Sequence, residues 1–220
     1  MKKGSNDRGG ASWGWLALWA GFVVYAARVA PPDDPGLTRA LVRGTFTGDF
    51  GAVDASIAAV FCLLGVVPLL ASAFILRDGA ARRLPAWPFA FGAFFVGAYA
   101  ILPWLALRSL GGPRLVPRAA GGVRRLLAGR FVRVAILPAI VSLVAWGAAC
   151  GHPAVYAEAF RTTAMVHVMT IDLALCTALL FVFVEEARAK VSSEPALARR
   201  VRFVPLLGSA LWNALVPRDP

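Results

Sequence analysis

The sequence predicts an all-α, polytopic helical bundle in a membrane, and three observations lead to this prediction. The 220 residues are 59% hydrophobic and only 16% charged, and their mean hydropathy is +0.68. In a typical soluble domain, about 25% of the residues are charged. Several apolar runs have the length of roughly 20 residues that a helix needs to cross a bilayer. They are too long and too uniform for barrel strands, so we expect helices.

Six transmembrane segments are expected along a single membrane domain of residues 1–220. Tryptophans open the first segment at the level of the lipid headgroups, and Asp54 can cap the N-terminus of the second. Pro88 suits the first turn of the third segment. The last segment has about 14 residues, so it spans only a thinned bilayer and is otherwise re-entrant or interfacial. The expected segments are residues 13–29, 54–76, 88–107, 134–150, 166–184 and 203–216.

Residues 108–133 are the most basic stretch of the chain, with seven arginines and no acidic residue. We expect a basic interfacial loop that binds the anionic headgroups of lipids. A surface that docks an anionic ligand or a protein is the alternative. The residues expected to dock lipid or a partner are Arg114, Arg118, Arg124, Arg125 and Arg130.

A second interfacial piece is expected at residues 37–50, before the second segment. Leu41 and Phe46 are expected to face the bilayer, and Arg39 and Arg43 are expected to face water. Residues 37–50 would then form a short helix that lies flat on the membrane surface.

The positions of the lysines and arginines predict how the chain is oriented, because short cytoplasmic loops carry an excess of them. With six spans, the loops after the first, third and fifth segments hold 15 of the 23, and the opposite side holds 8. Those loops are therefore expected in the cytoplasm, or in the stroma of a plastid, with both termini outside. Lys2, Lys3 and Arg8 near the N-terminus argue for the opposite orientation.

Asp172 is the residue most in need of explanation, since it lies within the expected fifth segment. A carboxylate inside a membrane is costly and is a functional-site hypothesis by default. We expect it to point into the bundle, either as a hydrogen-bonded clasp between two helices or as a group that binds a proton or a cation. At about 100° per residue it shares one helix face with Met165, Met169, Cys176, Leu179, Phe183 and Glu186.

Two further acids are candidates for a site. Glu186 lies where the fifth segment ends, and pairing of the acids there with Arg188 or Lys190 is expected. A carboxylate at a helix C-terminus is unfavourable for the helix dipole, which leaves a docking role for Glu186 as the alternative. For Asp54, the helix cap described above is favoured over a catalytic role.

The sequence contains few of the motifs and ligand sets that are typical of enzymes and metalloproteins. Its two histidines, His152 and His167, cannot form a multi-histidine metal site by themselves. Met165, His167 and Met169 are ligand types that suit copper, but the imidazole and the thioethers diverge on a regular helix. The motifs HExxH and GxSxG and the P-loop are absent from the sequence. We therefore expect no metal and no cofactor, and we favour a non-enzymatic protein.

The net charge of +11 does not indicate a nucleic-acid-binding protein. The basic residues gather in loops between apolar runs, where they orient the chain and meet anionic lipid headgroups. The expected partners are therefore the lipid bilayer itself and other subunits of a membrane complex.

Residues 60–108 contain an apolar run that ends in the turn RDG, followed by LPAWPF and then by GAYAILPWLALR. A later stretch, IDLALCTALLFVFVEEAR, combines an acid-containing span with a short charged motif. On these residues, about a third of the chain resembles a group of small uncharacterised multi-spanning proteins of cyanobacteria and plastids. The resemblance implies a thylakoid or cyanobacterial membrane and brings no established activity with it.

These observations favour a non-enzymatic assembly or scaffold factor, or a small transporter, of a photosynthetic-type membrane. A membrane-embedded enzyme that acts on a lipid or an isoprenoid pigment is the alternative. The surroundings of Asp172 are expected to separate these functions. A polar cavity that reaches its carboxylate would favour transport or catalysis, whereas dry, close packing around it would favour the scaffold.

Overall fold

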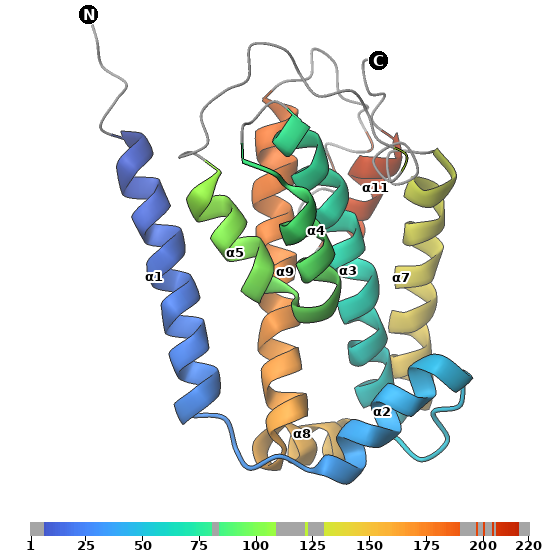
Figure 1. The fold of residues 1–220 in the computed structure, drawn as a ribbon. Helices are drawn as coiled ribbons and strands as arrows, with labels where there is room; N and C mark the ends of the chain where they lie inside the picture. The colour runs from blue at the N-terminus through green and yellow to red at the C-terminus, as the bar shows by residue number, and fades with distance from the viewer. Residues whose placement is uncertain are drawn as a thin grey trace, which may run out of the picture.

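The structure is a computed structural model, and it describes residues 7–80, 84–108, 122, 130–189, 197, 200, 204 and 206–215. In these residues the chain is helical and forms no strand, as the sequence predicts. The long helices, which run along the length of the molecule (Figure 1), are α1 (Asp7–Arg28), α3 (Ala55–Ala80), α7 (Arg130–Cys150) and α9 (Ala164–Arg188). The shorter helices are α2 (Pro35–Thr47), α4 (Trp87–Val96), α5 (Ala98–Leu107), α8 (Pro153–Thr162) and α11 (Leu207–Leu215).

Two of the described helices are long and apolar enough to cross a membrane. They are α3, over Ala55–Leu76, and α9, over Ala164–Arg188. A third candidate is α7 together with α8, if this pair is counted as one span despite a bend of 100° between them. The described residues thus contain two or three candidate spans, and the six segments expected from the sequence are not confirmed.

The apolar segment at residues 88–107 does not form the single helix that we expected. It is divided at Gly97 into α4 and α5, which have ten residues each and are therefore only about 15 Å long. Gly97 has φ 51° and ψ −123°, a conformation that is essentially restricted to glycine. This turn reverses the chain, so neither helix crosses the bundle.

The two short helices form a hairpin whose tip is Gly97. The rings of Phe89 in α4 and Trp104 in α5 lie 5.5 Å apart between centroids, so the two arms pack against each other. Figure 1 shows α4 and α5 meeting at about half the height of the bundle, with their other ends on the same side. We call α4 and α5 together the re-entrant hairpin.

The two ends of the bundle are named here by their residues. At the Arg108 end, where α3, α5 and α9 finish, Arg108 forms ion pairs with Asp78 and Glu186. At the opposite end, which we call the α2 end, α2 and α8 lie across the long helices (Figure 1). The first helix, α1, begins at the Arg108 end and finishes at the α2 end.

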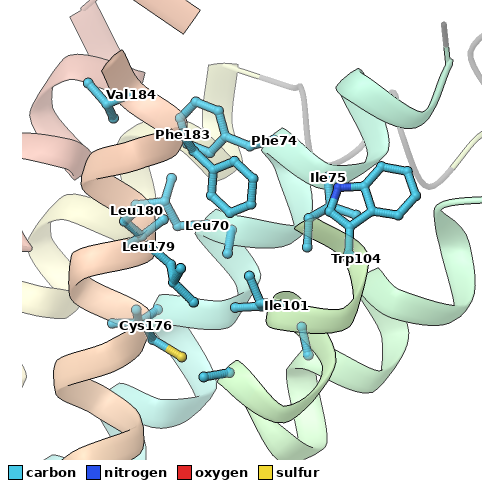
Figure 2. Close-up of a cluster of buried hydrophobic side chains, with 14 of the residues drawn as sticks. Leu70, Phe74, Ile75, Ile101, Trp104, Cys176, Leu179, Leu180, Phe183 and Val184 are labelled. Atoms are coloured by element: carbon cyan, nitrogen blue, oxygen red, sulfur yellow. The ribbon is translucent and has the colours of Figure 1, made fainter. Parts of the chain in front are cut away.

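The apolar core fills the half of the bundle between Asp172 and the Arg108 end. Figure 2 shows side chains of α3, α5 and α9 meeting there, and Phe74 stacks on Phe183 with 5.9 Å between ring centroids. From α11, Trp212 also stacks on Phe74 and is almost fully buried. With nine residues, α11 is too short to span, and it packs onto the core instead.

The expected interfacial piece at residues 37–50 is present as α2, but its faces differ from our prediction. Asp34 caps the helix by accepting a hydrogen bond of 2.8 Å from the amide of Gly36. Leu41 is fully buried in a small apolar cluster with Ile57, whereas Phe46 is 86% exposed. These two residues are five positions apart, which separates them by about 140° on a helix, so they cannot share a face.

Candidate functional site

Asp172 lies in α9 at the tip of the re-entrant hairpin and is only 6% exposed. Its Oδ1 accepts a hydrogen bond of 2.7 Å from the amide of Ala98, the first residue of α5. No side chain from the α5 segment itself caps this helix. The carboxylate therefore satisfies one of the free amides at the N-terminus of α5 and faces the positive end of its dipole. Asp172 points into the bundle, as the sequence analysis expected.

Gly97 is the residue that lets the carboxylate come this close. A Cβ atom at position 97 would collide with the carboxylate of Asp172, which would have to move away from the turn. The positive φ of 51° disfavours any other residue for a second, independent reason. The sequence analysis interpreted this glycine only as a point of close helix contact.

Cys176 and helix α1 form further hydrogen bonds near the point where Asp172 meets the hairpin. The thiol of Cys176 donates to Oδ1 of Asp172 over 3.8 Å, one turn further along α9. On the other side, Trp19 of α1 donates from Nε1 to the carbonyl of Tyr99 at 3.0 Å. That carbonyl lies four residues before Pro103, which has no N–H to offer it. An indole from α1 thus replaces the missing hydrogen bond inside α5.

Glu186 holds the other end of α5. Arg108, the C-cap of α5, donates from Nη1 to Oε2 of Glu186 at 2.7 Å and from Nη2 to Oε1. Asp78 at the end of α3 lies 3.6 Å from the same guanidinium, which is 13% exposed. We expected pairs among the acids and bases at the end of α9, and Glu185 forms one with Arg188 at 2.7 Å. Lys190, the other expected base, lies outside the described residues. Glu186 pairs instead with the hairpin.

Asp54 is a helix cap, as predicted, and it also joins two helices. Its Oδ1 accepts from the amide of Ser56 at 2.9 Å, at the start of α3. Its Oδ2 lies 2.9 Å from Nδ1 of His152, just before α8. Burial raises the pKa of the Asp54 carboxyl, but the hydrogen bonds from Ser56 and His152 outweigh it and lower the pKa to about 2. Asp54 is therefore ionised at neutral pH and holds α3 to the junction of α7 and α8.

His167 is also held by neighbouring helices. Its Nδ1 lies 2.8 Å from the carbonyl of Phe160, which can only accept, so Nδ1 carries the proton. Nε2 then accepts from the hydroxyl of Tyr25 at 2.6 Å. In the described part of the chain, no three His, Cys, Asp or Glu side chains are placed to hold a metal ion.

Two cavities lined by described residues lie at the α2 end, with volumes of about 710 and 580 Å³. The smaller one includes Asp54, Cys150 and His152 in its lining, and neither includes Asp172. Around Asp172 the described contacts are close packing and hydrogen bonds.

The basic loop expected at residues 108–133 lies outside the described residues, apart from Arg108, Gly122 and the start of α7. Arg130 opens α7, and its side chain is not among those described. The other arginines of the predicted docking surface that lie outside the described residues are Arg114, Arg118, Arg124 and Arg125. Their role in lipid or partner binding stays a prediction.

Sequence reasoning missed the roles of two hairpin residues: Gly97, which lets Asp172 approach the turn, and Arg108, which pairs with Glu186. One signal was available for the first, because a buried acid must find a donor and Gly97 interrupts an apolar run near its midpoint. Comparisons of the chain with protein-family models, with curated proteins and with solved structures found no match. Its function is therefore inferred from its own contacts.

Proposed function

We propose that this protein is a non-enzymatic, multi-pass membrane scaffold or assembly factor. One observation carries the proposal: all three acids that the sequence marked as site candidates join helices to one another. Asp172 and Glu186, both on α9, hold the N-terminus and the C-terminus of α5. The acids that a transporter or an enzyme would use are thus engaged in fixing the hairpin.

The charge distribution supports an orientation for this scaffold. The α2 end carries four of the 23 lysines and arginines, and the other 19 belong to segments that begin or finish at the Arg108 end. Because positively charged segments stay in the cytoplasm, we place the Arg108 end in the cytoplasm or, in a plastid, in the stroma. In this arrangement α1, α3, α7 and α9 cross the membrane. The hairpin returns to the side from which it entered, so both termini are cytoplasmic, opposite to the orientation expected for six spans.

A surface for partners is available on the outer side of the hairpin. Large aromatic side chains on α4 are exposed, including Phe91 at 65% and Phe95 at 69%. They lie four residues apart, so they share one face of the helix, and their rings are 5.0 Å apart between centroids. Aromatic side chains are enriched in protein–protein interfaces, and we propose that these rings contact another subunit of a photosynthetic-type membrane complex.

Site-specific photo-cross-linking in the native membrane tests this proposal. Benzoylphenylalanine would replace Phe91 or Phe95, with Val141 and Val144 on the exposed face of α7 as matched controls. We expect the two α4 positions to give the same discrete protein adduct, and the two α7 positions to give adducts with lipid. Lipid adducts alone at all four positions would contradict a scaffold that uses this face.

A small transporter is the second candidate, and one observation favours it. The chain breaks into two half-helices at mid-depth beside a buried acid, and transporters build their substrate and coupling-ion sites at such broken helices. Asp172→Asn separates the two functions, because asparagine keeps an acceptor for the amide of Ala98 but cannot take up a proton. A scaffold would retain its cross-links and its activity in cells, whereas a proton-coupled transporter would lose activity with its fold intact.

A further inference from the structure

The larger cavity at the α2 end combines two positive charges with an apolar wall. Its volume is about 710 Å³, and it lies between α2 and residues 49–53. Arg39 and Arg43 are four positions apart and line it from the same side of α2. The apolar part of the cavity wall is formed by Val42, Phe50 and Val53.

Neither guanidinium is neutralised by an acid in the described part of the chain. The nearby carboxylates are used locally instead. Asp34 accepts from the amide of Gly36, and Asp49 accepts from that of Gly51 at 2.9 Å. Asp49 also lines the cavity, so the lining carries two positive charges and one negative charge and is net positive. The α2 end as a whole is not net positive, because its acids outnumber its bases by five to four.

The position of α2 fixes the depth of this cavity in the membrane. The helix lies across the end of the bundle (Figure 1), immediately before the span that begins at Ala55. Val42 and Phe46 are one turn apart and are 45% and 86% exposed, while Leu41 anchors the helix to the bundle. Exposed apolar side chains beside arginines are typical of a helix at the boundary between headgroups and acyl chains.

We propose that this cavity binds the headgroup of an anionic phospholipid in the leaflet at the α2 end. Arg39 and Arg43 would donate charge-assisted hydrogen bonds to the phosphate, and an acyl chain would lie beside Val42 and Phe46. The apolar side chains around the arginines are the reason for choosing a lipid over a soluble phosphate. This site is separate from residues 108–133 and does not depend on the scaffold proposal.

The test uses the full-length protein in mild detergent with photoactivatable phosphatidylglycerol, followed by mapping of the labelled peptides. We expect adducts on residues 35–53, and a roughly tenfold loss of this labelling in the variant Arg39→Gln/Arg43→Gln, which corresponds to about 1.4 kcal/mol. Arg161→Gln, an exposed arginine of α8 at the same end, is the matched control and should label like the wild type.

Competition experiments identify the ligand. Unlabelled phosphatidylglycerol should displace the probe, and phosphatidylcholine at the same concentration should do so much less. Equal displacement by glycerol phosphate would show a soluble-phosphate site and overturn the choice of a lipid. The proposal also fails if Arg161→Gln loses as much labelling as the double variant, or if residues 35–53 are not labelled in the folded wild type.

Discussion

Of the aspartates that cap helix N-termini in the described residues, Asp54 and Asp172 do so in different ways. Asp54 accepts from the amide of Ser56, two residues along the chain, and lies at the edge of the bundle. Asp172 accepts from the amide of Ala98, which is 74 residues away, and it is buried inside the bundle. The start of α3 is therefore specified locally, whereas the start of α5 depends on α9 being packed in place.

The same contrast separates the two helical segments that the caps begin. α3 contains Pro68 and still runs without a break from Ala55 to Ala80. The hairpin breaks at Gly97, and Pro103 lies inside α5 without ending it. Proline alone does not decide where an apolar segment turns in this protein. The chain turns instead at Gly97, where the next amide, that of Ala98, bonds the distant residue Asp172. The following changes test that statement.

Gly97→Ala should have the largest effect. The new Cβ would collide with Oδ2 of Asp172, and alanine is strained at a φ of 51°. Together these costs predict a loss of about 3 kcal/mol or more in the free energy of unfolding. The measurement is reversible unfolding in mixed micelles, followed by circular dichroism.

Gly65→Ala is the matched control for this change. Gly65 lies inside α3, and a Cβ there would have no neighbour within 4 Å. Alanine is the better helix former, so we expect a small gain of stability, below about 1 kcal/mol. If the two alanine variants were equally stable, the hairpin turn would not depend on Gly97.

Asp172→Leu should have the next largest effect. Leucine leaves the amide of Ala98 buried without an acceptor, which predicts a loss of about 2 kcal/mol. Asp172→Asn keeps an acceptor and should lose much less. Hydrogen exchange at the Ala98 amide, measured by NMR in both variants, gives a local readout. Equal protection of this amide in the two variants would contradict the role of Asp172 as the cap of α5.

The difference between local and remote caps also explains which features the sequence could predict. The all-helical class, the candidate spans in α3 and α9 and the cap at Asp54 follow from hydropathy and from neighbours in the chain. The burial of Asp172 could be predicted from the cost of a charge facing lipid. Its partner could not, because a backbone amide has no side-chain signature and the run 88–107 has the length and hydropathy of an ordinary span.

The pair between Glu186 and Arg108 was not predicted, for a related reason. Arg188 and Lys190 lie within one turn along the chain, whereas Arg108 is 78 residues away. Local spacing therefore favoured the nearer bases. The return of the chain at Gly97 brings Arg108 to the end of α9, so this pair could not be expected from a single span over residues 88–107.

The local cap at Asp54 should be visible in the acid dependence of stability. The folded pKa of about 2 lies below the ordinary value of 3.8, so Asp54 contributes stability above about pH 4. This contribution disappears as the pH falls through about 2. Allowing for the exposed His152 partner, we expect it to be about 1 to 2 kcal/mol.

The measurement compares Asp54→Asn with the wild type from pH 6 to pH 2. Asparagine still caps α3 but does not titrate, so the difference in unfolding free energy between the two proteins should shrink over the acid part of this range. Other carboxylates titrate in both proteins and cancel in the difference. A difference that stays constant down to pH 2 would show that the charge of Asp54 contributes nothing to stability.

The smallest predicted effect concerns a third remote contact, from Trp19 to the carbonyl of Tyr99. Trp19→Phe should lose about 1 kcal/mol, because this carbonyl is left without the indole and Pro103 offers it no N–H. In a Pro103→Ala background the new amide can bond the carbonyl, so the same change should lose about 0.5 kcal/mol less. Trp13→Phe, at a position of α1 that is 73% exposed, should be close to neutral in both backgrounds. A double-mutant cycle measured by unfolding gives the coupling. Additive losses would mean that Trp19 stabilises α5 by packing alone. Hydrogen bonds from distant residues to the backbone of this hairpin would then be confined to its tip, at Asp172.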